Sequence, residues 1–201
     1  MNTTFDFEKD YLLEDDYVLL RPLKEDDWQN LVYFAENEPE IWQYSLVPVA
    51  GEINLKAYIG AALEAKQDLK EYPFIVFDKR MQEYAGSTRF YDIQLVNNTL
   101  QLGYTWYGKN FQRTGLNRHC KYLLLQFAFE TLGVERVEFR ADANNAKSIA
   151  AMKAIGCKVE GILRNNVPMH TGKRRDSIIL SILKEEWKNE VKLKLRKLIG
   201  N

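Results

Sequence analysis

The chain has 201 residues, 46% of them hydrophobic and 12% aromatic, which is enough for one large domain with a sizeable core. Its 28 basic and 28 acidic residues give a formal net charge of zero, so no general attraction to nucleic acid or to an anionic membrane is expected. The two cysteines, Cys120 and Cys157, are too few for a disulfide framework or a zinc site and are expected to be buried.

Residues 1–16 are polar and acidic, unlike a signal peptide, and are expected to form a loosely held leader. No apolar run approaches the roughly 20 residues of a membrane span. These observations predict a cytoplasmic protein without a membrane partner.

The spacing of apolar residues predicts the remaining elements in chain order. Strands are predicted at Tyr17–Pro22, Pro73–Asp78, Tyr84–Tyr91, Leu100–Tyr107, Val137–Ala141, Cys157–Leu163 and Ser177–Leu183, and helices at Lys24–Ala35, Ile53–Lys66, Leu116–Phe127 and Ala146–Ile155. A helix connects Leu100–Tyr107 to Val137–Ala141, so these two strands are predicted to be parallel. A largely antiparallel sheet with one such crossover indicates a three-layer α/β domain.

The C-terminal residues repeat apolar side chains at helical spacing. Trp187, Val191, Leu195 and Leu198 predict an amphipathic helix over residues 188–201 that covers the domain or a second subunit. No Gly/Ser/Pro linker divides the chain, so residues 17–187 are expected to form one domain. The oligomeric state is left open between monomer and homodimer.

The segment Gln112–Asn117 (QRTGLN) joins a strand to the strongest predicted helix. The first amides of a helix lack intrahelical partners and, with the helix dipole, form an anion site. Gly115 lets the backbone approach a phosphate closely, while Arg113 and Arg118 add cations. The Walker and dinucleotide-binding patterns are both absent from the sequence. The alternative is that Gly115 merely turns the chain into the helix.

Five segments in order resemble the GNAT N-acetyltransferase superfamily and, more closely, its RimJ/RimL-type branch. They are LRPL (Leu20–Leu23), LGYTW (Leu102–Trp106), QRTGLN (Gln112–Asn117), NNAKSIAAMKAIGCKVEGILR (Asn144–Arg164) and RDSIILSILKEEW (Arg175–Trp187). The resemblance covers roughly residues 17–187. It implies a mostly antiparallel twisted sheet with a splayed parallel strand pair and helices on both faces. It also implies transfer from acetyl-CoA to a primary amine without a metal.

The resemblance implies that the pantetheine arm lies between the splayed strands and the pyrophosphate on the turn. The cofactor-binding residues expected on this basis are Thr105, Trp106, Tyr107, Gln112, Arg113, Thr114, Gly115, Leu116, Asn117, Arg118, Asn145 and Ser148. Asn117 departs from the usual glycine or alanine, which puts the tightness of the turn in doubt.

The chemistry needs a neutral amine, because an ammonium group has no lone pair, and a group that stabilises the departing thiolate. Ser148 is the expected acid, with Tyr107 and Tyr104 as rivals. Helix capping is the alternative for Asn145 and Ser148. The base is left open between Glu160, Glu138, Asp176 and water.

The loop Glu36–Pro48 is expected to form part of the acceptor pocket. Trp42 and Tyr44 would wall it, and Glu36, Glu38 and Glu40 would attract a cationic amine, unless this is simply a solvated acidic loop. A protein or peptide α-amino group is the favoured acceptor, ahead of a small-molecule amine such as an amino acid, polyamine or antibiotic. A non-catalytic acyl-CoA sensor is the remaining alternative.

Overall fold

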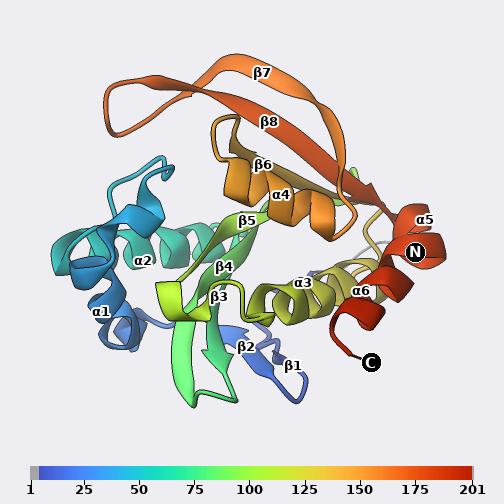
Figure 1. Ribbon diagram of the computed structural model, residues 1–201, viewed down its shortest axis with the longest axis horizontal. Helices are drawn as coiled ribbons and strands as arrows, with labels where there is room; N and C mark the ends of the chain where they lie inside the picture. Colours follow the sequence, from blue (N-terminus) through green and yellow to red (C-terminus); the bar gives the residue numbers. More distant parts are fainter. Residues whose placement is uncertain (1–4, 201) are drawn as a thin grey trace.

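The computed structural model describes residues 5–200, which form one eight-stranded sheet in the order β1-β2-β3-β4-β5-β6-β8-β7 (Figure 1). Neighbouring strands are antiparallel except for β5 and β6, which are parallel. The strands are β1 (Leu13–Glu14), β2 (Val18–Pro22), β3 (Tyr72–Asp78), β4 (Glu83–Gln94), β5 (Thr99–Tyr107), β6 (Arg136–Asp142), β7 (Lys158–Pro168) and β8 (Arg174–Leu183). The predicted crossover between β5 and β6 is confirmed.

Helices cover both faces of the sheet. They are α1 (Trp28–Asn37), α2 (Glu52–Gln67), α3 (Leu116–Gln126), α4 (Ala146–Ala154), α5 (Lys184–Glu186) and α6 (Lys192–Leu198). Helices α1 and α2 lie against one face, and α3 lies against the other with α4 and α6 beside it (Figure 1). Two π-helical turns, Phe127–Thr131 and Trp187–Val191, extend α3 and connect α5 to α6. This is the mixed α/β, three-layer arrangement that the sequence predicts.

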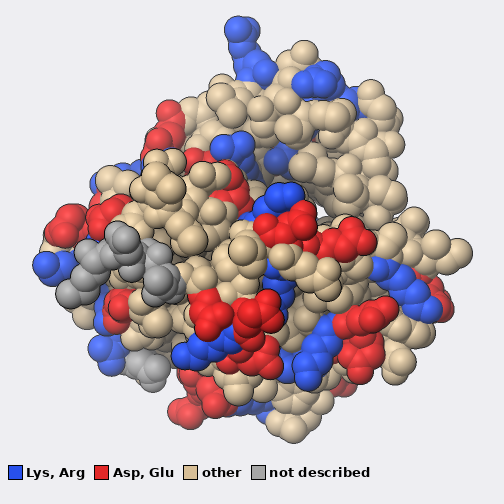
Figure 2. All heavy atoms as spheres, turned by 180° about the vertical axis from the view of Figure 1, so that it is seen from behind, with Lys and Arg blue, Asp and Glu red and all other residues tan. Residues whose placement is uncertain are grey.

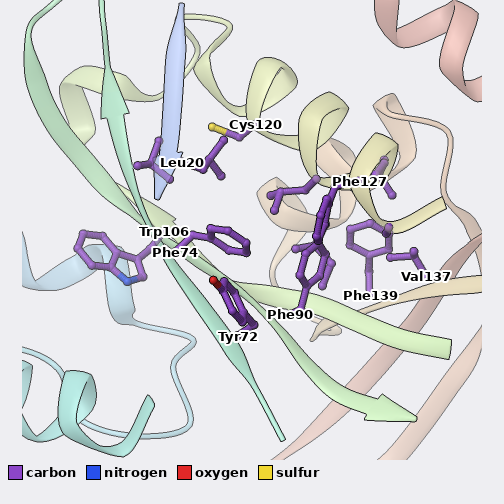
Figure 3. Close-up of a cluster of buried hydrophobic side chains, with 14 of the residues drawn as sticks. Leu20, Tyr72, Phe74, Phe90, Trp106, Cys120, Phe127, Val137 and Phe139 are labelled. Carbon is purple, nitrogen blue, oxygen red and sulfur yellow. The ribbon is translucent and has the colours of Figure 1, made fainter. Parts of the chain in front are cut away.

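One part of the core lies between α3 and the sheet, because apolar side chains at helical spacing on α3 meet alternate residues of the strands, and another part lies under α1 and α2. Phe90 on β4 stacks on Phe127 with ring centroids 6.1 Å apart, and Phe139 on β6 joins the same cluster (Figure 3). Trp106 lies apart from this group in Figure 3. Its ring packs instead on Trp42 and Phe34, on the side of the sheet covered by α1.

The expectation of a loosely held leader over residues 1–16 is wrong for its described part, residues 5–16. Phe5, Phe7 and Tyr11 are buried in the core. Phe5 packs against Phe127 with ring centroids 6.4 Å apart, and β1 pairs with β2. Burying an aromatic side chain contributes roughly 1.5–3 kcal/mol, which is enough to hold this segment in place. Residues 1–4 lie outside the described part of the chain.

The C-terminal segment packs on the chain's own α3. Trp187, Val191 and Leu195 are buried as expected, and the Trp187 ring stacks on Phe129 at 5.7 Å. Leu198 is 39% exposed, contrary to expectation, and Ile199 takes the buried position. The reason is that the buried residues recur every four positions, from Trp187 through Val191 and Leu195 to Ile199.

Candidate active site

The parallel strands β5 and β6 separate after a short paired segment. Thr99–Gln101 pairs with Arg136–Glu138, and no further β5–β6 pairing occurs within the described residues. β6 continues to Asp142 paired with β8 alone. The edge of β5 that faces β6 is therefore open from Leu102 to Tyr107, which confirms the predicted splay and leaves backbone groups available to a ligand.

A β-bulge interrupts β5 at the splay. Arg89 of β4 pairs with Gly103 and Ser87 pairs with Trp106, so β5 has one extra residue between the two pairs. Tyr104 has a positive φ of 48° and its side chain is 38% exposed. The alternation of side chains along β5 therefore changes at this residue. The Tyr104 ring meets the Tyr91 ring, with centroids 5.0 Å apart.

The turn before α3 has the geometry of an anion site. Gly115, with φ of 95°, is the residue before the first turn of α3, and a Cβ built on it would meet no atom within 4 Å. Gln112 Nε2 donates to the carbonyl of Tyr107 at 3.0 Å, and Thr114 Oγ1 donates to the carbonyl of Phe111 at 2.8 Å. These bonds fasten the turn to the end of the open strand. Arg113, Leu116, Asn117 and Arg118 lie in the same turn or in the first turn of α3.

Asn117 is directed toward the interior of the protein. The Tyr107 hydroxyl donates to Asn117 Oδ1 at 3.3 Å, so this departure from glycine or alanine does not crowd the open side of the turn. Tyr107 is buried beside Cys120, and desolvation raises the pKa of its hydroxyl well above the usual value. The hydroxyl is thus held between β5 and α3, where it packs as part of the core.

The first turn of α4 places the two α4 candidates together. Asn145 Oδ1 accepts a hydrogen bond from the backbone amide of Ser148 at 3.0 Å, so Asn145 caps the helix. The cap does not use the Ser148 hydroxyl, and Ser148 is half-buried. Tyr44 donates from its hydroxyl to the carbonyl of Asn144 at 3.2 Å, which brings the acceptor loop beside this turn.

The structure does not bring Glu160 to the turn or to α4. Glu160 on β7 pairs with Arg136 and accepts from the Ser181 hydroxyl, at the end where β5 and β6 are still paired. The Arg136 bond is the main reason that the pKa of Glu160 is lowered, which makes it a weak base. The alternatives are also engaged, because Glu138 bonds Arg136 and Arg140, and Asp176 accepts from the backbone amide of Asn165 on β7 at 2.6 Å.

The acidic loop is tied down by Lys109. Glu38 is buried and accepts from the Lys109 amide at 2.7 Å, and Glu40 pairs with the Lys109 ammonium group. Both acids are thus engaged by Lys109, and their attraction of a cationic amine stays a prediction. Trp42 is only 6% exposed and packs on Trp106 at 4.8 Å. Trp42 is therefore a core residue of this loop, while Tyr44 lies nearer the surface.

Sequence reasoning missed a wall of arginines and tyrosines on the face of the splay opposite α3. Arg89 is 4% exposed, and its guanidinium lies 4.1 Å from the Tyr104 ring centroid and 2.6 Å from a Glu71 oxygen. Arg175 donates to the Ser177 hydroxyl at 3.1 Å, and burial lowers its pKa. The sequence does carry a signal for this feature, because Arg89 and Tyr91 are two residues apart on one strand and so lie on the same face of the sheet.

The molecule is hollowed below the hairpin formed by β7 and β8, and Lys and Arg atoms lie within the hollow (Figure 2). The tip of this hairpin reaches the acceptor loop, because the amide of His170 donates to the carbonyl of Leu46 at 3.1 Å. The hairpin tip and this loop are therefore neighbours in the fold.

Neither metal-binding clusters nor membrane-spanning helices are found in residues 5–200. No group of three or more His, Cys, Asp or Glu side chains there could hold a metal ion. No helix in that range is long and apolar enough to cross a membrane. Both cysteines are free and buried, as expected.

The comparisons with known proteins agree with this geometry. Residues 18–158 match the acetyltransferase (GNAT) domain. The putative ribosomal N-acetyltransferase YdaF of Bacillus subtilis (strain 168) is 32% identical over 52% of this chain and 56% of its own length. A putative acetyltransferase from T. thermophilus is 30% identical, with a TM-score of 0.83 over 92% of this chain and 95% of that one. The microcin C7 self-immunity acetyltransferase MccE, solved with acetyl-CoA and AMP, has a TM-score of 0.74 at 23% identity, over 84% and 93%.

The match to YdaF agrees with the resemblance to the RimJ/RimL-type branch, although it spans only about half of that relative. The family match covers more than half of the chain and includes the splay, the turn and the first turn of α4. The chain belongs to the GNAT family of N-acetyltransferases.

Proposed function

We propose that the chain transfers an acetyl group from acetyl-CoA directly to a primary amine. The observation that carries the proposal is the joining of the open edge of β5 to the glycine turn before α3 by the Gln112–Tyr107 bond, 3.0 Å long. One ligand with an anionic end and an amide-bearing arm fits both features. The acetyl-CoA bound by the related fold of MccE supports this choice of donor.

In this proposal the turn and the splay bind different parts of acetyl-CoA. The first amides of α3, with Arg113 and Arg118, would hold the pyrophosphate, and the backbone of Thr105–Tyr107 would orient the pantetheine arm. Acetyl-CoA supplies the activated thioester. Asn145 and Ser148 would contact the arm and its sulfur from α4. A water molecule takes the amine proton in this proposal, because Glu160 is engaged elsewhere.

The acceptor that we favour is a protein or peptide α-amino group. Arg175 is the arginine that we assign to the acceptor face, because Arg89 is buried and already paired with Glu71. A guanidinium there disfavours polyamines and aminoglycosides and suits an acceptor with carbonyl or carboxylate oxygens. The word ribosomal in the name of YdaF supports a protein acceptor. A free amino acid is the second candidate, because its carboxylate would also suit Arg175.

The test is an acceptor screen that follows free thiol release from acetyl-CoA. Its key comparison uses one peptide with a free N-terminus and the same peptide with that terminus blocked and a lysine retained. We expect release with the first peptide, none with the second, and weak release with polyamines. Release with the blocked peptide would move the acceptor to lysine. Absence of saturable acetyl-CoA binding at millimolar ligand would overturn the proposal as a whole.

A further inference from the structure

Lys121 is a buried cation at the floor of the splay. It lies on α3, is 5% exposed, and donates from Nζ to Thr105 Oγ1 at 2.8 Å. Nζ also lies 5.9 Å from the ring centroid of Phe139. Thr105 is on β5 and Phe139 on β6, both beyond the last paired residues of these strands. The lysine therefore spans the gap from the α3 side, just where the strands have parted.

The surroundings of Lys121 offer it no counterion. Among residues 5–200, the neighbours that act on its charge are the thiols of Cys120 and Cys157, and no carboxylate lies within 4.0 Å of Nζ. Burial raises the pKa of both thiols to about 12, so they are neutral at physiological pH. On the β5 side Nζ meets the hydroxyl of Thr105, which also shares a hydrogen bond of 2.7 Å with Thr88. A buried cation in neutral surroundings is costly unless an anion arrives there.

We propose that Lys121 is a catalytic residue that stabilises and protonates the coenzyme A thiolate as it leaves. The inference rests on the proposed function, because that is what places a thioester in the splay. The amine nitrogen bonds to the thioester carbon, the C–S bond breaks, and its electron pair remains on sulfur. A proton then moves from Lys121 Nζ to sulfur, and the proton shed by the amine restores the lysine through solvent.

The acidity of the lysine suits this step. Burial lowers the pKa of Lys121 to about 8, close to the roughly 8.5 of a free thiol. Proton transfer between groups of similar pKa is nearly balanced, so neither direction meets a large thermodynamic barrier. A serine hydroxyl is a far weaker acid. Ser148 would then orient the sulfur by a hydrogen bond, while Lys121 supplies the charge and the proton.

A signal for this residue was present in the sequence. Lys121 lies four residues after Asn117 and three before Leu124, on the arc of α3 that faces the sheet. A lysine in a buried arc, with no acidic residue one turn away on the same helix, is a candidate for function.

The experiment titrates bound coenzyme A, the product, and so needs no acceptor. The ultraviolet absorbance of the thiolate is followed against pH in the wild type, Lys121→Met, Lys121→Gln and the surface control Lys194→Met. We expect the wild type and the control to lower the thiol pKa by about one unit, as a nearby cation does. Lys121→Met and Lys121→Gln should leave it at or above the free value. Cys120 and Cys157 titrate higher and do not interfere.

Lys121→Gln separates charge from hydrogen bonding, because its amide can still donate to Thr105. Both lysine variants should lose about 10²-fold in turnover while acetyl-CoA binding changes less than about threefold. If coenzyme A bound to the wild-type protein titrates with the pKa of the free thiol, the role of Lys121 is overturned. This result does not depend on whether any variant folds. Saturable acetyl-CoA binding in that same sample would leave the proposed function intact.

Discussion

In the first turn of α4, Asn145 caps the helix through the backbone amide of Ser148, and the hydroxyl of that same serine is the group that we propose for the chemistry. Ser148→Ala removes a hydroxyl that the cap does not use. We expect turnover to fall roughly tenfold to a hundredfold, with acetyl-CoA affinity and melting temperature nearly unchanged.

Asn145→Ala is the matched control for the serine variant. It should cost about 1 kcal/mol of stability, because an orphan helix amide loses its acceptor. Turnover and thermal melting of the two variants show whether the Ser148 hydroxyl acts in catalysis or only the helix cap matters. A wild-type rate for Ser148→Ala would remove the serine from the chemistry.

The buried ammonium of Lys121 also makes stability depend on pH. Its pKa is about 8 in the folded protein and about 10.4 in an unfolded chain. Between these values the unfolded state binds more protons, so the free energy of unfolding rises with pH. Relative to Lys121→Met, the wild type should gain on the order of 1 kcal/mol between about pH 8 and pH 9.

Chemical denaturation of the two proteins at several pH values measures this gain. The raised thiol pKa values of Cys120 and Cys157 act in the opposite direction at higher pH, but both proteins keep them, so the difference cancels their effect. A flat difference between the proteins would mean that Lys121 is charged in the folded state throughout.

The turn before α3 allows the expected phosphate site to be tested by substitutions at a single residue, Gly115. Gly115 has a left-handed φ of 95° with open space around its Cβ position. Gly115→Glu and Gly115→Gln place side chains of similar size there with the same backbone cost, of roughly 1–3 kcal/mol. Only the glutamate adds a charge beside the pyrophosphate.

We expect Gly115→Glu to weaken coenzyme A binding at least tenfold more than Gly115→Gln does, with the difference shrinking in high salt. Calorimetric titration of the three proteins at two salt concentrations measures this. Equal affinities in the two folded variants would place the phosphates elsewhere.

β5 shows how far sequence reasoning reaches at the scale of an element. Its alternating apolar residues predicted the strand and the parallel crossover, because both follow from local periodicity. The bulge at Tyr104 did not follow, because the extra residue is defined only by the register against Ser87 and Arg89 on β4. Thus the backbone of the splay was predictable, but the side chains on its acceptor face were not.

For the whole molecule, too, features set by local sequence could be predicted and features set by distant partners could not. The glycine turn before α3, the capping asparagine and the family could be predicted, because each is signalled by short runs of neighbouring residues. The docking of Phe5 on Phe127 and the engagement of Glu160 by Arg136 depend on partners more than 20 residues away. The boundaries expected at residues 17 and 187 likewise depend on tertiary packing, and both flanking segments bury aromatic or aliphatic side chains in the same core. The cytoplasmic location and the oligomeric state remain predictions.

The contact between Gly156 and Val191 tests whether the C-terminal segment is part of the domain. A Cβ on Gly156 would lie 2.9 Å from a Val191 methyl, and Gly156 has φ of 105°. Gly156→Ala should therefore destabilise the protein through backbone strain and a clash. Val191→Ala should cost roughly 2 kcal/mol, because it empties a site that is 2% exposed.

In the double variant the new alanine methyl occupies part of the space that Val191 leaves, so the clash is relieved. We expect the combined loss to be smaller than the sum of the two single losses by about 1 kcal/mol. Urea denaturation of the four proteins measures this coupling, and acetyl-CoA affinity serves as the control for an intact turn. Strict additivity would mean that the segment after Trp187 does not dock on the end of α4 in solution. The domain would then end near residue 187, as the sequence alone suggested, and the packing of α6 on α3 would contribute nothing to its stability.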